Sequence, residues 1–481
     1  MFMEVALSAS STDSTIYIWD IRSGSTIFSF KQNMCNKGGL TLVPRPGATM
    51  QTGAIVTAQV DRAVLNVYDW QRDQILHKMT TPEKMVSVTA SHQGTYVAAA
   101  TAGGRVYLWH IATGHLLRVF DAHYRRVTRL AFSGDDATLL TAGEDAAVNV
   151  WLVAHLLESE ERPAPLYSWS DHTLPVSDLF VGHGGISSTR VYTSSLDHTV
   201  KLWDLATGTL LTTFLFPKPV STVVLDPSET MLFAACEDKI YSLELYRRRQ
   251  QQAYGSDTVE SVGGLGKVEA VGVKSTVDER SSSSQGSVFS GHSGTITSLA
   301  LSFDASILIS SSEDGNCIVW DVVSRQPLRK FESHKGPVTH VACFLRPAEL
   351  ATGASAQKIL PMPWKSFKRA MPTQEEEKRT ESEHLIMNSH MDMKQHQWLV
   401  EAGPLYSSIP SALEPIRRVK ETLRTINTED SSNSLQSQIT ALQSELVRLH
   451  EHHSKVKSLH DEMYNTMVDE FMTKRRKRHL E

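Results

Sequence analysis

Short stretches of alternating apolar and polar residues recur through the first two thirds of the chain, usually ending in an aromatic residue. Alternation predicts β-strands, because successive side chains of a strand point to opposite faces of a sheet. Four strong copies begin with a polar turn containing Asp, at Thr12–Asp20, Glu144–Trp151, Leu196–Asp204 and Glu313–Asp321. Three weaker copies lie between them, at Val64–Asp69, Gly104–His110 and Lys239–Glu244. The sequence therefore contains seven copies of one unit.

The period of these copies, about 40 to 50 residues, resembles that of WD repeats, each of which forms a four-stranded blade of a β-propeller. We expect an all-β fold, a seven-bladed WD-repeat β-propeller over residues 1–345. One interval is too long, because a low-complexity run at 247–285 separates the sixth and seventh copies. It predicts a disordered insert over about residues 247–287.

The ring is expected to close with a strand from the far end of the repeats. The chain opens on a second-strand pattern, Glu4–Ser10, so the first blade lacks an innermost strand. The alternating segment Val338–Phe344 follows the last repeat and can supply it. Closure of this kind would leave no exposed sheet edge between the first and last blades.

The resemblance to WD repeats implies a hydrogen-bonded cluster in each strong blade, made of a His, a Ser or Thr, an Asp and a Trp. Such a cluster satisfies polar groups that would otherwise be buried without partners. Because a His, Ser and Asp grouping that recurs beside a Trp is expected to be structural, we predict no catalysis from it. The expected sets are His123, Thr141, Asp145 and Trp151; His172, Ser195, Asp197 and Trp203; His292, Ser311, Asp314 and Trp320; and, across the closure, His334, Asp13 and Trp19.

The repeat pattern stops at Leu345, and several prolines predict an irregular linker over residues 346–434. Within it, Pro361–Arg369 mixes aromatic and basic residues, and the sequence leaves open whether it straps the propeller or binds a partner. Residues 435–473 predict a coiled-coil α-helix, since apolar residues recur at steps of four and three. The predicted seam consists of Leu435, Ile439, Leu442, Leu446, Leu449, Val456, Met463 and Met467.

We expect this helix to make the protein a homodimer; the alternative is that it docks on its own propeller. The basic tail at 474–481 contains a possible nuclear import signal, and the alternative is a solvated tail. That signal would consist of Lys474, Arg475, Arg476, Lys477 and Arg478.

Composition narrows the chemistry. The formal net charge is −5 at pH 7, which excludes a global basic field for binding nucleic acid. The four cysteines are scattered without zinc-ligand spacing, so we expect reduced thiols, no metal and no cofactor. No segment has the length of apolar residues that a membrane helix needs. These patterns favour a non-enzymatic protein on the cytosolic and nuclear side.

The segments His172–Leu179 and Arg190–Trp203, with the opening Met3–Val5, resemble the WD-repeat subunits of Rix-type complexes, the family of animal WD-repeat protein eighteen. The resemblance implies a nuclear scaffold, in nucleolus and nucleoplasm, needed for processing internal transcribed spacer 2 of pre-rRNA and for maturing pre-60S ribosomal particles. It implies as partners the helical-repeat subunits of the complex, pre-60S particles and a Midasin-family AAA ATPase. The alternative is a substrate-receptor propeller of a ubiquitin ligase.

Overall fold

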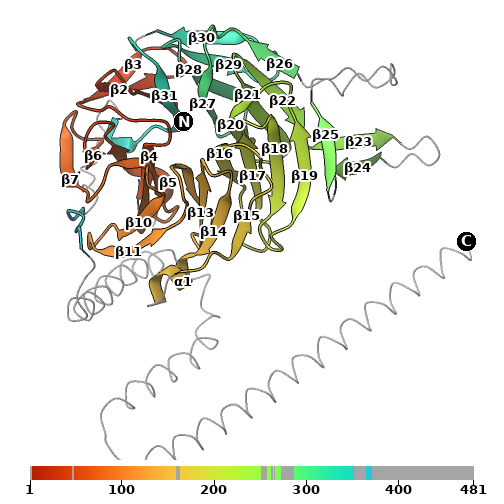
Figure 1. The fold of residues 1–481 in the computed structure, drawn as a ribbon. Helices are drawn as coiled ribbons and strands as arrows, with labels where there is room; N and C mark the ends of the chain where they lie inside the picture. The colour runs from red at the N-terminus through yellow and green to blue at the C-terminus, as the bar shows by residue number, and fades with distance from the viewer. Residues whose placement is uncertain are drawn as a thin grey trace, which may run out of the picture. The chain divides into compact units, whose positions relative to one another are not determined.

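The computed structural model describes residues 3–350 and 364–370, apart from 46–47, 159–162, 251–256, 262–263, 265, 272–286 and 333. Within these residues, seven antiparallel sheets surround a common axis as the blades of a propeller (Figure 1). The expected seven-bladed fold is therefore confirmed. The described segments include no helix long and apolar enough to span a membrane. The predicted coiled coil and basic tail lie outside the described residues.

Each blade is a four-stranded meander that runs from the axis to the rim. Blades one to four contain, from the axis outward, β31 (Val338–Leu345), β1 (Glu4–Ser10), β2 (Thr15–Asp20) and β3 (Thr26–Lys31); β4 (Leu40–Arg45), β5 (Ala48–Ala58), β6 (Val64–Asp69) and β7 (Ile75–Thr80); β8 (Met85–Ala90), β9 (Tyr96–Thr101), β10 (Arg105–His110) and β11 (Leu116–Asp121); β12 (Val127–Phe132), β13 (Thr138–Gly143), β14 (Val148–Leu152) and β15 (Tyr167–Trp169).

In blade four a short helix of six residues, α1 (Val153–Glu158), separates β14 from β15. Blades five to seven follow the same strand order. Their strands are β16 (Val176–Val181), β17 (Arg190–Ser195), β18 (Thr199–Asp204) and β19 (Leu210–Leu215); β20 (Val220–Leu225), β21 (Met231–Cys236), β22 (Lys239–Glu244) and β26 (Ser287–Ser290); β27 (Ile296–Leu301), β28 (Ile307–Ser312), β29 (Cys317–Asp321) and β30 (Pro327–Phe331). We call the end of the ring where the innermost strands begin the top face, and the opposite end the bottom face.

Closure occurs as the sequence predicts. β31 pairs antiparallel with β1, and Val5 lies opposite Phe344 in the register. Because β1 opens the repeats and β31 follows the last strand of blade seven, the hydrogen bonds between them anchor the chain that leaves blade seven in blade one and so close the ring.

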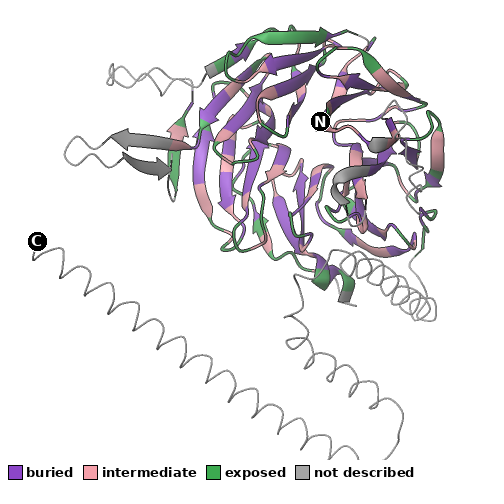
Figure 2. Ribbon diagram, turned by 180° about the vertical axis from the view of Figure 1, so that it is seen from behind, coloured by how far each residue is buried: buried purple, intermediate pink, exposed green. Residues whose placement is uncertain are grey.

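Aromatic side chains hold neighbouring blades together. The third-strand Trp203 of blade five stacks on Trp169 in the outermost strand of blade four, with ring centroids 4.6 Å apart. Trp19 of blade one stacks in the same way on Phe331 of blade seven. Each pair buries large apolar surfaces between the flat faces of two sheets. Buried residues accordingly fill the space between the blades, whereas exposed residues gather on outer strands such as β30 (Figure 2).

The insert between β22 and β26 is more ordered than its composition predicts. β23 (Tyr246–Gln250) and β24 (Asp257–Ser261) form a hairpin, and β25 (Lys267–Ala270) pairs parallel with β19 as a fifth strand of blade five (Figure 1). Directly after β25, the side chain of Val271 is buried against blade five. The prediction of a disordered insert is therefore wrong for these strands, because a propeller blade leaves the outer edge of its last strand free to pair.

Residues 364–369 strap the side of the propeller, which is the first of the two roles that the sequence left open. Phe367 stacks on Trp109 at 5.3 Å, and the Trp109 Nε1–H donates to the Lys368 carbonyl at 3.0 Å. Blade three has Ala99 where the strong blades carry a Ser or Thr, so the strap supplies the acceptor that this indole needs.

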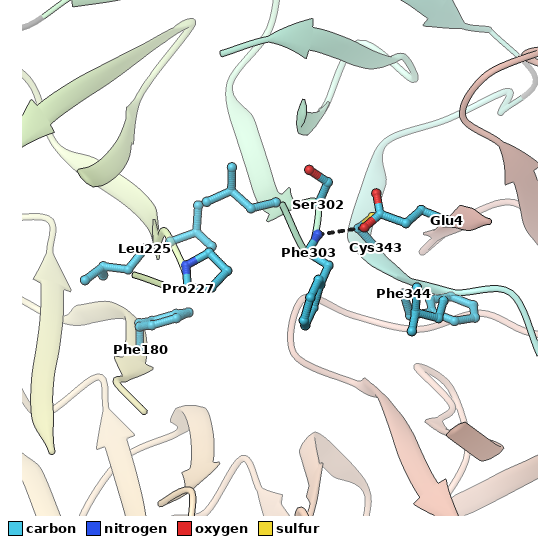
Figure 3. A pocket seen from close by; sticks show the side chains of 11 residues that line it. Glu4, Phe180, Leu225, Pro227, Ser302, Phe303, Cys343 and Phe344 are labelled. Atoms are coloured by element: carbon cyan, nitrogen blue, oxygen red, sulfur yellow. Dashed lines mark hydrogen bonds between the residues drawn. The ribbon is translucent and has the colours of Figure 1, made fainter. Parts of the chain in front are cut away.

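The innermost strands line a channel along the axis. On the bottom face, the last residues of β16, β20, β27 and β31 surround a pocket with a volume of about 400 Å³ (Figure 3). Two features of this channel, a polar constriction and the pocket, are described below.

Candidate functional site

The polar cluster of blade four contains the four residues expected from the sequence. His123 Nδ1 lies 3.0 Å from Asp145 Oδ1, and His123 Nε2 lies 2.8 Å from Thr141 Oγ1. The Trp151 Nε1–H donates to the same Thr141 oxygen at 3.2 Å. With an ionised Asp145 as acceptor, His123 carries its proton on Nδ1 and accepts the Thr141 hydroxyl proton at Nε2. The cluster is then a continuous relay from indole to carboxylate.

In blade five the sequence prediction of the residue that supplies the hydroxyl is wrong. Thr193, not Ser195, contacts His172 Nε2 at 2.8 Å and accepts from the Trp203 Nε1–H at 3.0 Å. Ser195 instead donates to the Leu174 carbonyl at 2.9 Å, within the adjacent turn. His172 Nδ1 and Asp197 Oδ2, 2.9 Å apart, complete the cluster as expected.

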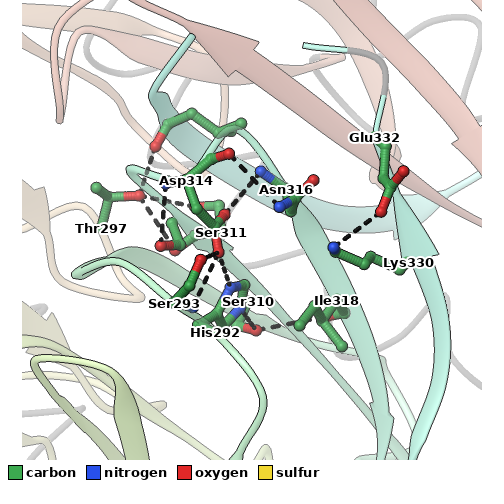
Figure 4. Close-up of polar contacts among 12 residues, drawn as sticks. His292, Ser293, Thr297, Ser310, Ser311, Asp314, Asn316, Ile318, Lys330 and Glu332 are labelled. Carbon is green, nitrogen blue, oxygen red and sulfur yellow. Dashed lines mark hydrogen bonds and ion pairs between the residues drawn. The ribbon is translucent and has the colours of Figure 1, made fainter. Parts of the chain in front are cut away.

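Blade seven needs the same correction. Ser310, not Ser311, lies 2.7 Å from His292 Nε2 and accepts from the Trp320 Nε1–H at 2.8 Å (Figure 4). Ser311 lies on the opposite face of β28, where its hydroxyl contacts Thr297 Oγ1 at 3.0 Å. Successive residues of a strand point to opposite sides, so Ser311 cannot reach the indole.

Strand register gives the signal that could have located these hydroxyls. Trp151, Trp203 and Trp320 lie opposite Leu139, Val191 and Leu308, and the hydroxyl residue follows two positions later on the same face. In blades four, five and seven this position also lies four residues before the Asp of the turn. A fixed offset from that Asp therefore identifies the hydroxyl in these three blades.

The fourth cluster spans the closure of the ring. His334 Nδ1 lies 3.2 Å from Asp13 Oδ2, and His334 Nε2 lies 2.9 Å from Ser8 Oγ. The Trp19 Nε1–H donates to Ser8 at 2.8 Å. The sequence predicted that His334, Asp13 and Trp19 share this cluster but did not predict Ser8. Ser8 lies two residues after Ala6, and Ala6 is opposite Trp19 in the strand register.

Electrostatics favour the ionised carboxylates of Asp145 and Asp197 and the neutral form of His292. Burial alone would raise the pKa of Asp145 and Asp197, but hydrogen bonds from His123 and His172 leave both below the usual value. Burial lowers the pKa of His292 although the carboxylate of Asp314 opposes the shift. Because each polar atom in the relay already has a partner inside the blade, the clusters fix the top-face turns in place.

A second polar feature closes the channel near the top face. Six of the innermost strands carry a polar residue at their third position, as in Val127-Thr128-Arg129, and in blade two Lys37 lies just before β4. The repeated bulge around the second residue of most of these strands turns the third toward the axis. The seven residues of this constriction are Lys37, Ser87, Arg129, Asp178, Thr222, Ser298 and His340.

Charges in the constriction are linked across the channel. Arg129 Nε lies 3.1 Å from Asp178 Oδ1, and Thr222 donates its hydroxyl to Asp178 Oδ2. Lys37 of blade two reaches the main-chain carbonyl of Ser221 in blade six. His340 also belongs to the constriction, and burial, with the positive charge of Arg129, lowers its pKa to about 3. No cluster of metal-ligand type occurs among the residues that the structure describes.

The top face presents apolar side chains beside the polar clusters. Tyr124 directly follows His123 and is 98% exposed, while its main-chain N–H donates to Asp145 at 3.2 Å. Leu174 and Leu196 are half exposed on the turns of the neighbouring blade five. Rigid turns that display exposed aromatic and aliphatic groups are typical of protein interfaces.

Seven blades around one axis, four of which carry this cluster, define a WD-repeat β-propeller. The family "WD domain, G-beta repeat" matches residues 114–151, 163–204 and 283–321, which lie in blades three to seven. Over 367 residues the chain is 31% identical to WD repeat-containing protein 18 of Homo sapiens, covering 75% of this chain and 77% of that protein.

Two fungal relatives show the same extent of similarity. Pre-rRNA-processing protein crb3/ipi3 of Schizosaccharomyces pombe is 32% identical over 350 residues, covering 69% of this chain and 74% of that protein. Pre-rRNA-processing protein IPI3 of Yarrowia lipolytica is 34% identical over 330 residues, covering 67% and 72%. The chain belongs to the family of WD repeat-containing protein 18 and IPI3, which confirms the resemblance seen in the sequence.

Proposed function

We propose that the protein is a non-catalytic scaffold of ribosome biogenesis, the WD-repeat component of a Rix-type complex. In this role it is needed for processing internal transcribed spacer 2 and for maturing pre-60S particles. One observation carries the proposal: two relatives named for pre-rRNA processing are 32% and 34% identical over two thirds or more of this chain. The ring with its exposed top-face side chains supports a scaffold role, because it offers a rigid surface to several partners.

The proposed partners are the helical-repeat subunits of the complex, pre-60S particles and a Midasin-family AAA ATPase, within the nucleolus and nucleoplasm. The sequence Lys474–Arg478 is proposed as the import signal. Deleting these five residues should move a fluorescently tagged protein to the cytoplasm. Nuclear accumulation of the deletion variant would contradict the assignment.

Depletion of the protein in its host tests the main proposal. We expect precursors that retain internal transcribed spacer 2 to accumulate on RNA blots, and a tagged copy to copurify with pre-60S proteins. A copy that instead brings down a cullin adaptor, without ribosomal precursors, would favour the ubiquitin-ligase alternative.

Tyr124→Ala can test whether the top face carries a partner. Its side chain is almost fully exposed, so the substitution should leave thermal stability unchanged while weakening recovery of a helical-repeat subunit. Val323→Ala is the matched control, since Val323 is 83% exposed and lies at the rim of blade seven. Equal recovery with both variants would place that partner elsewhere.

The proposed homodimer rests on the heptad pattern of residues 435–473, which the structure does not describe. The full-length protein should sediment as a dimer at micromolar concentration, and charges in the seam should make it monomeric. The seam variant replaces Leu442, Leu446 and Leu449 by Asp; the control adds the same charge outside the seam at Thr440, Ser444 and Ser458. A wild-type monomer, or equal effects of both variants, would contradict dimerisation through this helix.

A further inference from the structure

The pocket at the bottom mouth of the channel has no role in the blade clusters or in the proposed import and dimer segments. Its walls come from blades five, six, seven and one. Figure 3 shows Phe180, Leu225 and Pro227 on one side of the view, Phe344 and Glu4 on the other, and Phe303 between them. A cavity of about 400 Å³ has the size of a site for a small ligand or for one or two large side chains.

Apolar walls follow from the alternation of the innermost strands. Phe180 lies two residues beyond Asp178 and Val224 two residues beyond Thr222, so both face the axis below the polar constriction. The side chains that face the axis therefore change from polar, at Asp178 and Thr222, to apolar, at Phe180 and Val224, over two residues of each strand. A peptide or ligand that enters from the bottom face meets apolar side chains first.

Phe303 is an exposed aromatic at this mouth. It is 63% exposed, and its main-chain N–H donates to Glu4 Oε1 at 2.8 Å, which ties the blade-seven turn to blade one. A large aromatic side chain that is held in place yet open to solvent is a typical anchor of protein interfaces.

Charge at the mouth is negative. Glu4 lines the pocket, Asp304 follows Phe303, and Asp226 precedes the lining residue Pro227. No Lys or Arg is among the described lining residues, and the nearby Arg346 donates to the Leu350 carbonyl. An apolar cavity edged by carboxylates favours a guest that combines an apolar side chain with a cation.

We propose that this pocket binds a segment of a partner protein in which a large apolar side chain stands next to Arg or Lys. The apolar side chain enters between Phe180 and Phe344, and the cation lies against the carboxylates of Glu4 and Asp304. The proposal depends on the pocket alone and holds whether or not the protein acts in ribosome assembly.

Short peptides test both halves of the proposal on the full-length protein. The probe is acetyl-Arg-Leu-Phe-Arg-amide, and ligand-observed NMR measures its affinity. We expect binding with a Kd below about 1 mM, at least about tenfold weaker binding of acetyl-Glu-Leu-Phe-Glu-amide, and weaker binding still of acetyl-Arg-Gly-Gly-Arg-amide. No binding of the probe, or equal binding of the charge-reversed peptide, would overturn the proposal.

Variants locate the binding on the protein. Phe303→Ala should weaken the probe about tenfold, because it removes the exposed anchor. Glu4→Gln keeps an oxygen for the Phe303 N–H but removes the charge, so it should weaken the probe severalfold and reduce the effect of salt. Val323→Ala, on the rim of blade seven, is the control and should bind as the wild type does. Unchanged thermal midpoints show that the variants are folded; a probe that binds all four proteins equally lies elsewhere, and the proposal fails.

Discussion

Thr193→Val removes one hydroxyl from the blade-five cluster and keeps the shape of the side chain. In the wild type this fully buried hydroxyl contacts His172 Nε2 at 2.8 Å and accepts from the Trp203 Nε1–H at 3.0 Å. The variant leaves two buried polar groups without partners. Since each such group costs about 1 to 3 kcal/mol, and partial relaxation offsets some of the loss, we expect a destabilisation of about 2 to 4 kcal/mol.

Ser195→Ala is the matched control because Ser195 was the hydroxyl expected from the sequence. Its bonds to the Leu174 carbonyl at 2.9 Å and from the Asp197 N–H at 3.2 Å lie in a part-buried turn. Loss of these bonds should cost only about 1 kcal/mol, since the freed groups are closer to water.

Urea unfolding, followed by tryptophan fluorescence, measures the difference between the two variants. By the average unfolding entropy per residue, each kcal/mol should also lower the Tm by roughly 1 to 2 °C in a propeller of this size. Equal losses in both variants, or a larger loss in Ser195→Ala, would refute the assignment of Thr193 to the relay.

Thermal unfolding and limited proteolysis test three further features by substitution. His340 has a pKa near 3 in the folded protein and near 6.5 in the unfolded chain, so the unfolded chain binds one more proton between these pH values. The free energy of unfolding should therefore fall as the pH drops below about 6.5. His340→Gln should flatten this pH dependence, and an unchanged slope would contradict the burial of His340. Gly114→Ala places a methyl group 2.4 Å from the Ser366 carbonyl and should make the strap more susceptible to proteases. The control Gly266→Ala has a similar positive φ but no neighbour within 4 Å, so it should cost only about 1 to 2 kcal/mol of backbone strain. Equal rates of proteolysis for the two variants would argue against the strap. Val271→Asp should destabilise blade five by burying a charge, while Val268→Asp, at 67% exposure, should not; if the pair behaves alike, Val271 is not buried in solution.

The hydroxyl of each cluster shows where sequence reasoning reached its limit. His, Asp and Trp stand at landmarks of the repeat, at the start of the inner strand, in the tight turn and at the end of the third strand. Around the hydroxyl, however, Thr193-Ser194-Ser195 and Ser310-Ser311-Ser312 offer several candidates in a row. Strand pairing decides among them, because only the residue two positions beyond the partner of the Trp lies on the correct face and within reach.

By itself the sequence determined the number of blades, the closure of the ring and the family. Those properties depend on local alternation, on turns and on matched residues, all of which can be read along the chain. Only the tertiary structure decided that residues 364–369 strap blade three, that β25 extends blade five, that Lys37 reaches blade six, and that Phe180 and Phe344 face one pocket. These contacts join residues that lie far apart in sequence, and only the circular arrangement of seven twisted sheets brings them together.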